Sequence, residues 1–171
     1  MPLICACEKS NLEDVKMMIA NHDVDATGMT LNEMVNTVGK NSDGHKCIAL
    51  SSILDNNERK DIKSYLLKHG ADLQLAYKTK YPNDMPLICA CEKGRFDDVK
   101  VFIANHDVNG TGVTLNEMIN QVHMHATYGG FGHGETNVTA LSTVLDDNQK
   151  NDIKSYLLVH GADLHLAYKT K

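Results

Sequence analysis

The sequence predicts an all-α solenoid, formed by the tandem duplication of a unit that contains two helix–turn–helix repeats. Three observations support this prediction. The segment "MPLICACEK" at residues 1–9 returns at residues 85–93. Residues 1–38 match residues 85–122 at 27 of 38 positions, and residues 47–80 match residues 138–171 at 24 of 34. Within each half of a copy, apolar residues recur at helical spacing, with glycine between or after the apolar stripes.

The duplication divides the chain into two long units. The first spans residues 1–80, the linker "YPND" spans residues 81–84, and the second unit spans residues 85–171. We expect both units to stack as one repeat domain over residues 1–171, because each repeat buries its apolar faces against its neighbours. The second unit is longer by seven residues, which fall between Val122 and Val138.

The first half of each unit predicts two short helices. In the second copy Pro86 stands in the first turn of the first helix, where proline is tolerated, and Gly94 separates the helices. Helical spacing predicts that equivalent residues of both copies are buried, namely Leu3, Cys5, Ala6, Val15 and Ile19, with Leu87, Cys89, Ala90, Val99 and Ile103.

The second half of each unit predicts another helix pair. In the second copy Gly161 follows the last apolar residue, as a glycine in the left-handed conformation does when it ends a helix. The two apolar stripes consist of Leu141, Val144 and Leu145, and of Ile153, Leu157 and Leu158.

These halves resemble ankyrin repeats. The segments "MPLICAC" and "GRFDDVKVFI" match the family pattern at Pro86, Leu87, Ala90, Gly94, Val99 and Lys100, and "YLLKHGADL" and "YLLVHGADL" match its closing Gly-Ala-Asp segment. We count four diverged repeats, near residues 1–28, 47–78, 85–112 and 138–171. Met1 and Met85 replace the threonine that opens the family pattern, so the first helix of each unit should lack a side-chain cap. The resemblance implies a protein–protein interaction module without a catalytic step.

An inserted segment follows the first helix pair of each unit. Both insertions begin with "TLNEM", in which threonine and the glutamate three residues later form a capping box. This pattern predicts an additional short helix. Its apolar face, which should pack on the core rather than bind a ligand, consists of Leu31, Met34, Val35 and Val38 in the first copy.

After the inserted helix the two copies diverge, into "GKNSDGHK" at residues 39–46 and "HMHATYGGFGHGETN" at residues 123–137. We interpret both segments as loops, and we expect them to contact a protein partner because loops on a rigid scaffold commonly have binding functions. The predicted contact residues are Lys40, Asn41, Asp43 and His45 in the first loop, and His123, His125, Tyr128, Phe131 and His133 in the second, with Tyr128 and Phe131 as aromatic anchors.

Two alternative site hypotheses concern metal and thiol chemistry. His123, His125 and His133 could supply three imidazoles to zinc or copper, but no cysteine or carboxylate at ligand spacing completes such a site. Cys-x-Cys occurs at Cys5 and Cys89, but residues two apart on a helix do not face each other. We therefore expect buried structural thiols and no metal or other cofactor.

Composition and the absence of further motifs exclude several functions. The net charge of −5, with no large basic cluster, argues against nucleic acid, and no apolar run is long enough for a membrane span. The five cysteines, an odd number, and the absence of a basic, apolar leader favour a cytoplasmic location with reduced thiols. No catalytic motif is present, so no catalytic residue is predicted.

The principal alternative to a partner-binding module is a structural role. The first repeat nearly copies the third and the fourth nearly copies the second, so neither end has the distinct capping repeat that arrays normally have. The chain would then be a segment of a longer array, or copies would associate end to end through a heterologous contact. An enzyme or metal-binding protein built on the histidine-rich loop is the third hypothesis.

Overall fold

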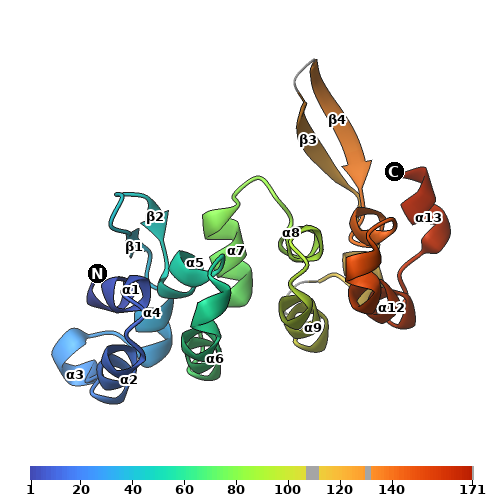
Figure 1. Ribbon diagram of the computed structural model, residues 1–171. Coiled ribbons are helices and arrows are strands. Elements are labelled where there is room, and N and C mark those ends of the chain that lie inside the picture. The colour runs from blue at the N-terminus through green and yellow to red at the C-terminus, as the bar shows by residue number, and fades with distance from the viewer. Residues whose placement is uncertain (107–111, 130–131, 171) are drawn as a thin grey trace. The chain divides into compact units, whose positions relative to one another are not determined.

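The computed structural model describes residues 1–106, 112–129 and 132–170, with the side chains of Asp25, of residues 125–129 and of residues 132–135 left aside. The chain forms two compact, mostly helical units, Met1–Pro82 and Asn83–Lys171 (Figure 1). Over the described ranges, no helix has the length and apolar character to cross a membrane.

The first unit begins with the helices α1 (Pro2–Glu8), α2 (Leu12–Ala20), α3 (Val24–Thr27) and α4 (Leu31–Asn36). Pro2 occupies the first turn of α1, and Met1 before it provides no side-chain cap, as predicted. Ser10, between α1 and α2, has a left-handed backbone with φ of 57°. Asn11 then caps α2, because its side-chain oxygen accepts a hydrogen bond of 3.1 Å from the backbone N–H of Asp14.

The rest of the first unit contains a short hairpin and a second group of helices. The hairpin pairs β1 (Gly39–Lys40) with β2 (Lys46–Cys47). After it come α5 (Ala49–Ile53), the 3₁₀ turn η1 (Asn57–Arg59), α6 (Lys60–Lys68) and α7 (Leu73–Lys80). Helix α1 packs on α2 and α5, α2 packs on α6, and α5 packs on α7.

Over its described residues the second unit has a similar order of elements, with the 3₁₀ turn η2 in place of the helix α5. Helices α8 (Pro86–Glu92), α9 (Phe96–Ala104) and α11 (Leu115–Ile119) precede the antiparallel strands β3 (His123–Gly129) and β4 (Gly132–Val138). The 3₁₀ turns η2 (Ser142–Val144) and η3 (Asn148–Lys150) and the helices α12 (Asn151–Val159) and α13 (Leu164–Lys169) complete it. Figure 1 shows the β3–β4 hairpin projecting from the helices of its unit.

The core agrees with the predicted helical registers at nine of the ten positions predicted to be buried. Leu3, Ala6, Val15 and Ile19 are buried, as are Leu87, Cys89, Ala90, Val99 and Ile103. The prediction was wrong at Cys5, whose side chain is exposed. The equivalent Cys89 has the same position in an identical helix sequence and is buried, so helical register alone does not decide burial at this position.

In each unit a basic residue at the end of a 3₁₀ turn, η1 or η3, caps the C-terminus of the unit's first helix. Arg59 donates from Nη1 to the carbonyl of Cys7 (3.0 Å) and from Nη2 to that of Glu8 (2.6 Å). The equivalent Lys150 donates to the carbonyl of Glu92 at 2.7 Å. Both cations therefore lie at a helix C-terminus, where positive charge is stabilising.

The inserted helices are fixed to the Gly-Ala-Asp turns by an asparagine in each unit. The Nδ2 group of Asn36 donates to the carbonyl of Gly70 (2.9 Å), and its Oδ1 accepts from the backbone N–H of Asp72 (2.8 Å). In the second unit Asn120 makes the same two contacts, to Gly161 at 2.9 Å and to Asp163 at 2.7 Å. Each amide thus links segments more than thirty residues apart.

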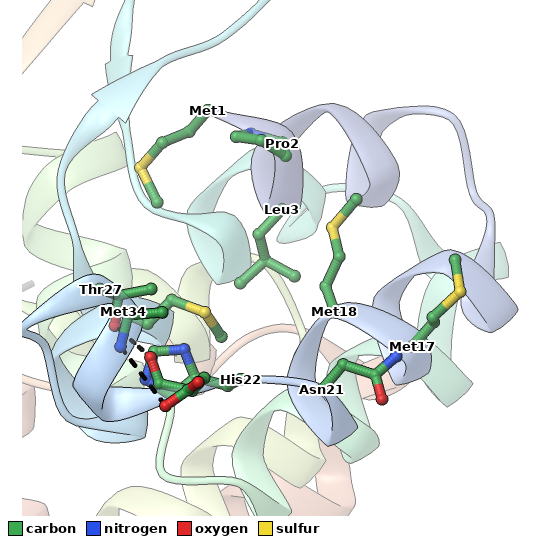
Figure 2. Close-up of a pocket in the computed structure, with 11 residues that line it drawn as sticks. Met1, Pro2, Leu3, Met17, Met18, Asn21, His22, Thr27 and Met34 are labelled. Carbon is green, nitrogen blue, oxygen red and sulfur yellow. Dashed lines mark hydrogen bonds between the residues drawn. The ribbon is translucent and has the colours of Figure 1, made fainter.

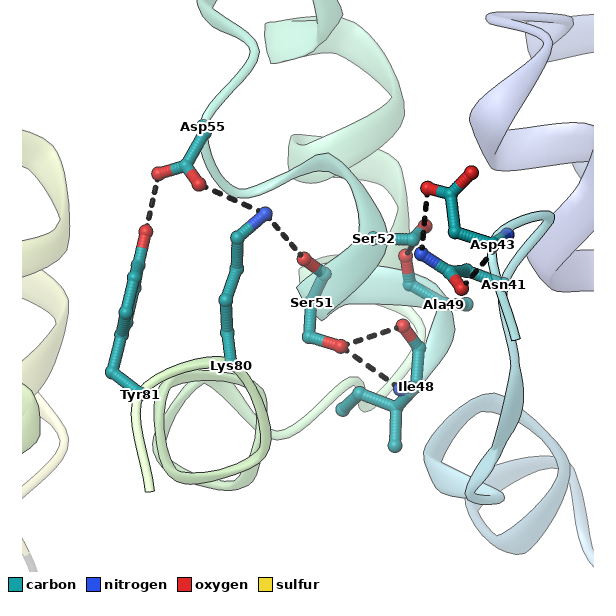
Figure 3. Close-up of polar contacts among 9 residues, drawn as sticks. All are labelled: Asn41, Asp43, Ile48, Ala49, Ser51, Ser52, Asp55, Lys80 and Tyr81. Carbon is teal, nitrogen blue, oxygen red and sulfur yellow. Dashed lines mark hydrogen bonds and ion pairs between the residues drawn. The ribbon is translucent and has the colours of Figure 1, made fainter. Parts of the chain in front are cut away.

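Lys80, the last residue of α7, links this helix to α5. Lys80 donates to the carbonyl of Ser51 (3.3 Å) and pairs with a carboxylate oxygen of Asp55 (2.9 Å), while the hydroxyl of Tyr81 donates to the other oxygen of Asp55 (Figure 3). These contacts hold the end of the first unit's last helix against its core.

The structure corrects several further expectations. Val38 does not share the face of the inserted helix, because α4 ends at Asn36 and the Val38 side chain is exposed. Leu158 is exposed although Ile153 and Leu157 of its predicted stripe are buried. The stripe of Val144 lies in a 3₁₀ turn rather than an α-helix. Residues 123–137, interpreted as a loop, lie largely in the β3–β4 hairpin, and the first segment also contains paired strands.

Candidate partner-binding surface on the two hairpins

The turn of the β1–β2 hairpin is organised by Asn41. Its Oδ1 accepts from the backbone N–H groups of Asp43 (3.1 Å) and His45 (2.7 Å), and its backbone N–H donates to the carbonyl of His45 (2.9 Å). Gly44 completes the turn with φ of 82°, a conformation that side-chain-bearing residues rarely adopt. The short segment is therefore a defined turn, as the Asp43-Gly44 pair in its sequence indicates.

Helix α1 holds this turn in place. The Glu8 carboxylate accepts hydrogen bonds of 3.2 Å from both the backbone N–H and the hydroxyl of Ser42. At the hairpin base, Gly39 lies so close to α1 that a Cβ atom there would come within 2.8 Å of the Ile4 side chain. These contacts fix the position of the hairpin relative to helix α1 of its unit.

The β1–β2 hairpin presents a pair of lysines. Lys40 and Lys46 are direct cross-strand partners, and both are exposed, as is the neighbouring His45. Like charges placed opposite each other on a ladder are mutually destabilising, so an anionic group bound between them would remove a repulsion. The predicted contact residues Lys40, Asp43 and His45 are accessible here, whereas Asn41 serves the turn itself.

The β3–β4 hairpin is longer and has a different surface. Its register runs from His123 opposite Val138 to Gly129 opposite Gly132. At the ladder position equivalent to the lysine pair, Met124 lies opposite Asn137, and the Met124 side chain is 58 % exposed. The second unit thus presents an apolar residue where the first presents two positive charges.

The base of this hairpin is attached to the start of the second unit. His123 donates from Nε2 to the backbone carbonyl of Asn83 at 3.0 Å. His123 is only partly exposed. We therefore interpret it as a residue that orients the hairpin rather than as a free contact for a partner.

The register also shows how the predicted histidines are distributed. His125 lies opposite Thr136 and His133 lies opposite Tyr128, so neither is paired with His123. The side chains of His125, Tyr128 and His133 lie outside the described residues, as does the whole of Phe131. Among the residues that are described, no group of three or more histidine, cysteine, aspartate or glutamate side chains could hold a metal ion.

The buried cysteines lack the character of reactive or ligating thiols. Burial raises the pKa of the Cys7, Cys89 and Cys91 thiols to about 12, and it also raises the pKa of Cys47. Since the thiolate is the nucleophile and the metal ligand, these four side chains act as small core residues. Only Cys5 has an exposed thiol.

The sequence comparisons give no independent indication of function. No known family model matches this chain, and no curated protein matches its sequence.

Two residues of this surface were not among those predicted. Lys46 lies opposite Lys40, and Met124 is the second unit's equivalent of Lys40, so strand pairing rather than residue type identifies both. The sequence signal that could have found them is the divergence itself, because both stand in the short stretches where the otherwise similar copies differ.

Proposed function

We propose that this chain is a protein–protein interaction module, in which each unit contains two ankyrin-type repeats and presents a hairpin to a partner. The observation that carries this proposal is the contrast between the copies. The capping boxes of the inserted helices and the contacts of Asn36 and Asn120 are duplicated, whereas the hairpin segments differ in length, eight residues against fifteen, and in charge. A scaffold preserved around a divergent segment is the arrangement expected of a binding module.

The two hairpins would recognise different chemistry. Lys40 and Lys46 suit an acidic segment of a partner, because each exposed charge gains a counter-charge on binding. The second segment, with exposed Met124 and with Tyr128 and Phe131 in its sequence, suits an apolar or aromatic surface. This proposal includes no catalytic step and no cofactor, and it places the module in the cytoplasm.

Affinity capture followed by binding measurements on the identified partner tests the proposal. We expect Tyr128→Ala and Phe131→Ala each to weaken the complex more than tenfold, since truncating central aromatic anchors typically costs ~2 kcal/mol or more. The matched control is Tyr156→Ala, an aromatic truncation on α12, away from the hairpin; it should leave partner affinity unchanged while lowering stability. Unchanged affinity in both hairpin variants would place the binding surface elsewhere.

A further inference from the structure

The β3–β4 ladder forms a two-stranded sheet of its own. Its residue pairs run without interruption from His123 opposite Val138 to Gly129 opposite Gly132. Over the described part of the chain no third strand joins this sheet, and neither strand packs extensively on any other helix or strand. In an antiparallel pair only alternate residues direct their N–H and C=O groups to the opposite strand. About three or four residues of β3 therefore direct theirs outward.

The outer edge of β3 lacks the features that usually protect a strand edge. The β3 sequence, HMHATYG, contains no proline, lysine, arginine, aspartate or glutamate. The other described strands differ, because β4 contains Glu135, and β1 and β2 are two residues long and contain Lys40 and Lys46. Proline, charged residues and short length are the means by which proteins prevent an edge from pairing with another chain. Among the described strands, β3 is thus the one open to an added strand.

The length of this edge is specific to the second unit. The second hairpin segment has fifteen residues against eight in the first, and strands of seven residues replace strands of two. The additional residues therefore extend a ladder. A longer ladder adds main-chain donors and acceptors along its edges, and another chain in an extended conformation is what pairs with such a row.

We propose that β3 binds an extended segment of the protein partner, which adds to the β3–β4 sheet as a third strand. This inference rests on the proposed partner-binding function and specifies how the second hairpin recognises its partner. Main-chain hydrogen bonds supply affinity in this mode, and neighbouring side chains supply selectivity. The β3 sequence alternates apolar and polar residues, with Met124, Ala126 and Tyr128 as the apolar ones. A partner segment with the same alternation and no net charge therefore suits this edge.

A synthetic peptide of defined sequence tests the proposal before the partner is known. The probe is acetylated, amidated TVTVTVT, which matches β3 in length, has no charge and consists of residues that favour strands. Amide exchange of the full chain is followed by NMR at increasing probe concentration. We expect saturable binding in which every second amide of β3 gains at least tenfold protection while the β4 amides do not change. Binding through side chains alone would not produce this alternation.

Altered probes and chains identify the interaction. A probe with N-methyl groups on its three central residues loses those donors and should bind at least tenfold more weakly. Ala126→Lys gives β3 an edge charge and places it opposite Glu135, where opposite charges favour the hairpin. This variant should bind the probe at least fivefold more weakly and keep the β3–β4 ladder. The matched control is Thr136→Lys on β4, which should bind the probe as the unaltered chain does.

A pocket in the first unit is a second place where the valines of the probe could bind. It lies between α1, α2 and α4 (Figure 2), has a volume of about 460 Å³, and its apolar lining includes Met1, Leu3, Met17, Met18 and Met34. Met17→Lys places a charge at this pocket and should leave the affinity for the probe unchanged. Loss of binding in this variant would assign the probe to the pocket and overturn the proposal.

Several other results would also overturn strand addition at β3. They are the absence of saturable binding, equal binding of the N-methylated probe, and protection confined to β4. Dimers of the unaltered chain in sedimentation that Ala126→Lys converts to monomers would assign the edge to a second copy instead. The peptide test uses no partner, so its failure leaves the hairpin function to be judged separately, by the partner affinity of Tyr128→Ala and Phe131→Ala.

Discussion

The asparagine that fixes each inserted helix gives a prediction that can be tested twice, because Asn36 and Asn120 make the same contacts in the two units. Replacing Asn36 by alanine should destabilise the first unit, because its amide joins α4 to the turn before α7. Two long-range hydrogen bonds disappear, from Asn36 to Gly70 and from Asp72 to Asn36, with lengths of 2.9 and 2.8 Å. At ~0.5–1.5 kcal/mol each, the loss is about 1–3 kcal/mol. Gly70 and Asp72 are exposed, so water partly replaces the amide and the lower half of that range applies.

Hydrogen exchange followed by mass spectrometry of peptides localises this effect. The Asp72 amide should lose protection in Asn36→Ala, while the equivalent Asp163 amide should be unaffected. Asn120→Ala should give the reverse, because Asn120 makes the same contacts in the second unit. Lys68 and Val159 differ between the copies, so peptides from the two turns are distinguishable by mass.

The control for this test is Asn32→Ala. It removes only a local partner of the Asn36 amide and keeps both long-range bonds. Equal loss of protection in Asn32→Ala and Asn36→Ala would refute the assigned role of the amide. So would an Asn36→Ala chain with unchanged exchange at Asp72 and unchanged stability in urea.

Four further predictions follow from the fold. Leu87→Ala should lower the free energy of unfolding by about 2–5 kcal/mol, and an unchanged urea midpoint would contradict its buried position. Ser10→Gly should stabilise the chain by about 0.5–1 kcal/mol by relieving a left-handed backbone at φ of 57°, measured by thermal melting. Thiol labelling of the native chain should modify Cys5 alone, and rapid labelling of a second cysteine would be inconsistent with the burial. Hydrogen bonds with Thr30 and Thr114 lower the pKa of Glu33 and Glu117. The stability that these carboxylates contribute to the fold above pH ~4.3 should therefore be lost as the pH falls, and the loss should be smaller in a chain in which both are replaced by Gln.

The sequence predicted the helical elements that local chemistry specifies. Thr30 and Thr114 form the expected capping boxes, and Gly161 ends α12 with φ of 97°. These features depend on residues only a few positions apart, so the sequence displays them directly. The apolar stripes of Leu3 and Leu87 were correct for the same reason.

Helices α7 and α13 were missed although the sequence contains a signal for them. Asp72 caps α7 by accepting from the backbone N–H of Leu75 at 3.0 Å, and Leu73, Ala76 and Tyr77 are its buried residues. A cap followed by apolar residues at spacings of three and four predicts a helix, but the glycine before it was interpreted only as the end of the preceding one.

The hairpins could not be inferred from composition. The glycines of residues 123–137 suggested a loop, whereas the ladder from His123 to Val138 depends on pairing between strands. The β1–β2 turn depends in addition on a contact between Ser42 and Glu8, which are 34 residues apart. Contacts at that separation follow from the tertiary arrangement, and helical periodicity does not reveal them.

An exchange of hairpins between the units is the measurement that tests the central claim most directly. Residues 123–137 are replaced by "GKNSDGHK" of residues 39–46, a segment that the homologous scaffold of the first unit already accommodates. Affinity for the captured partner is then measured by calorimetry, with circular dichroism as the control for folding. We predict a folded chain whose affinity for the partner of the second hairpin is more than tenfold lower. A folded exchange chain that binds the same partner with unchanged affinity would contradict the account.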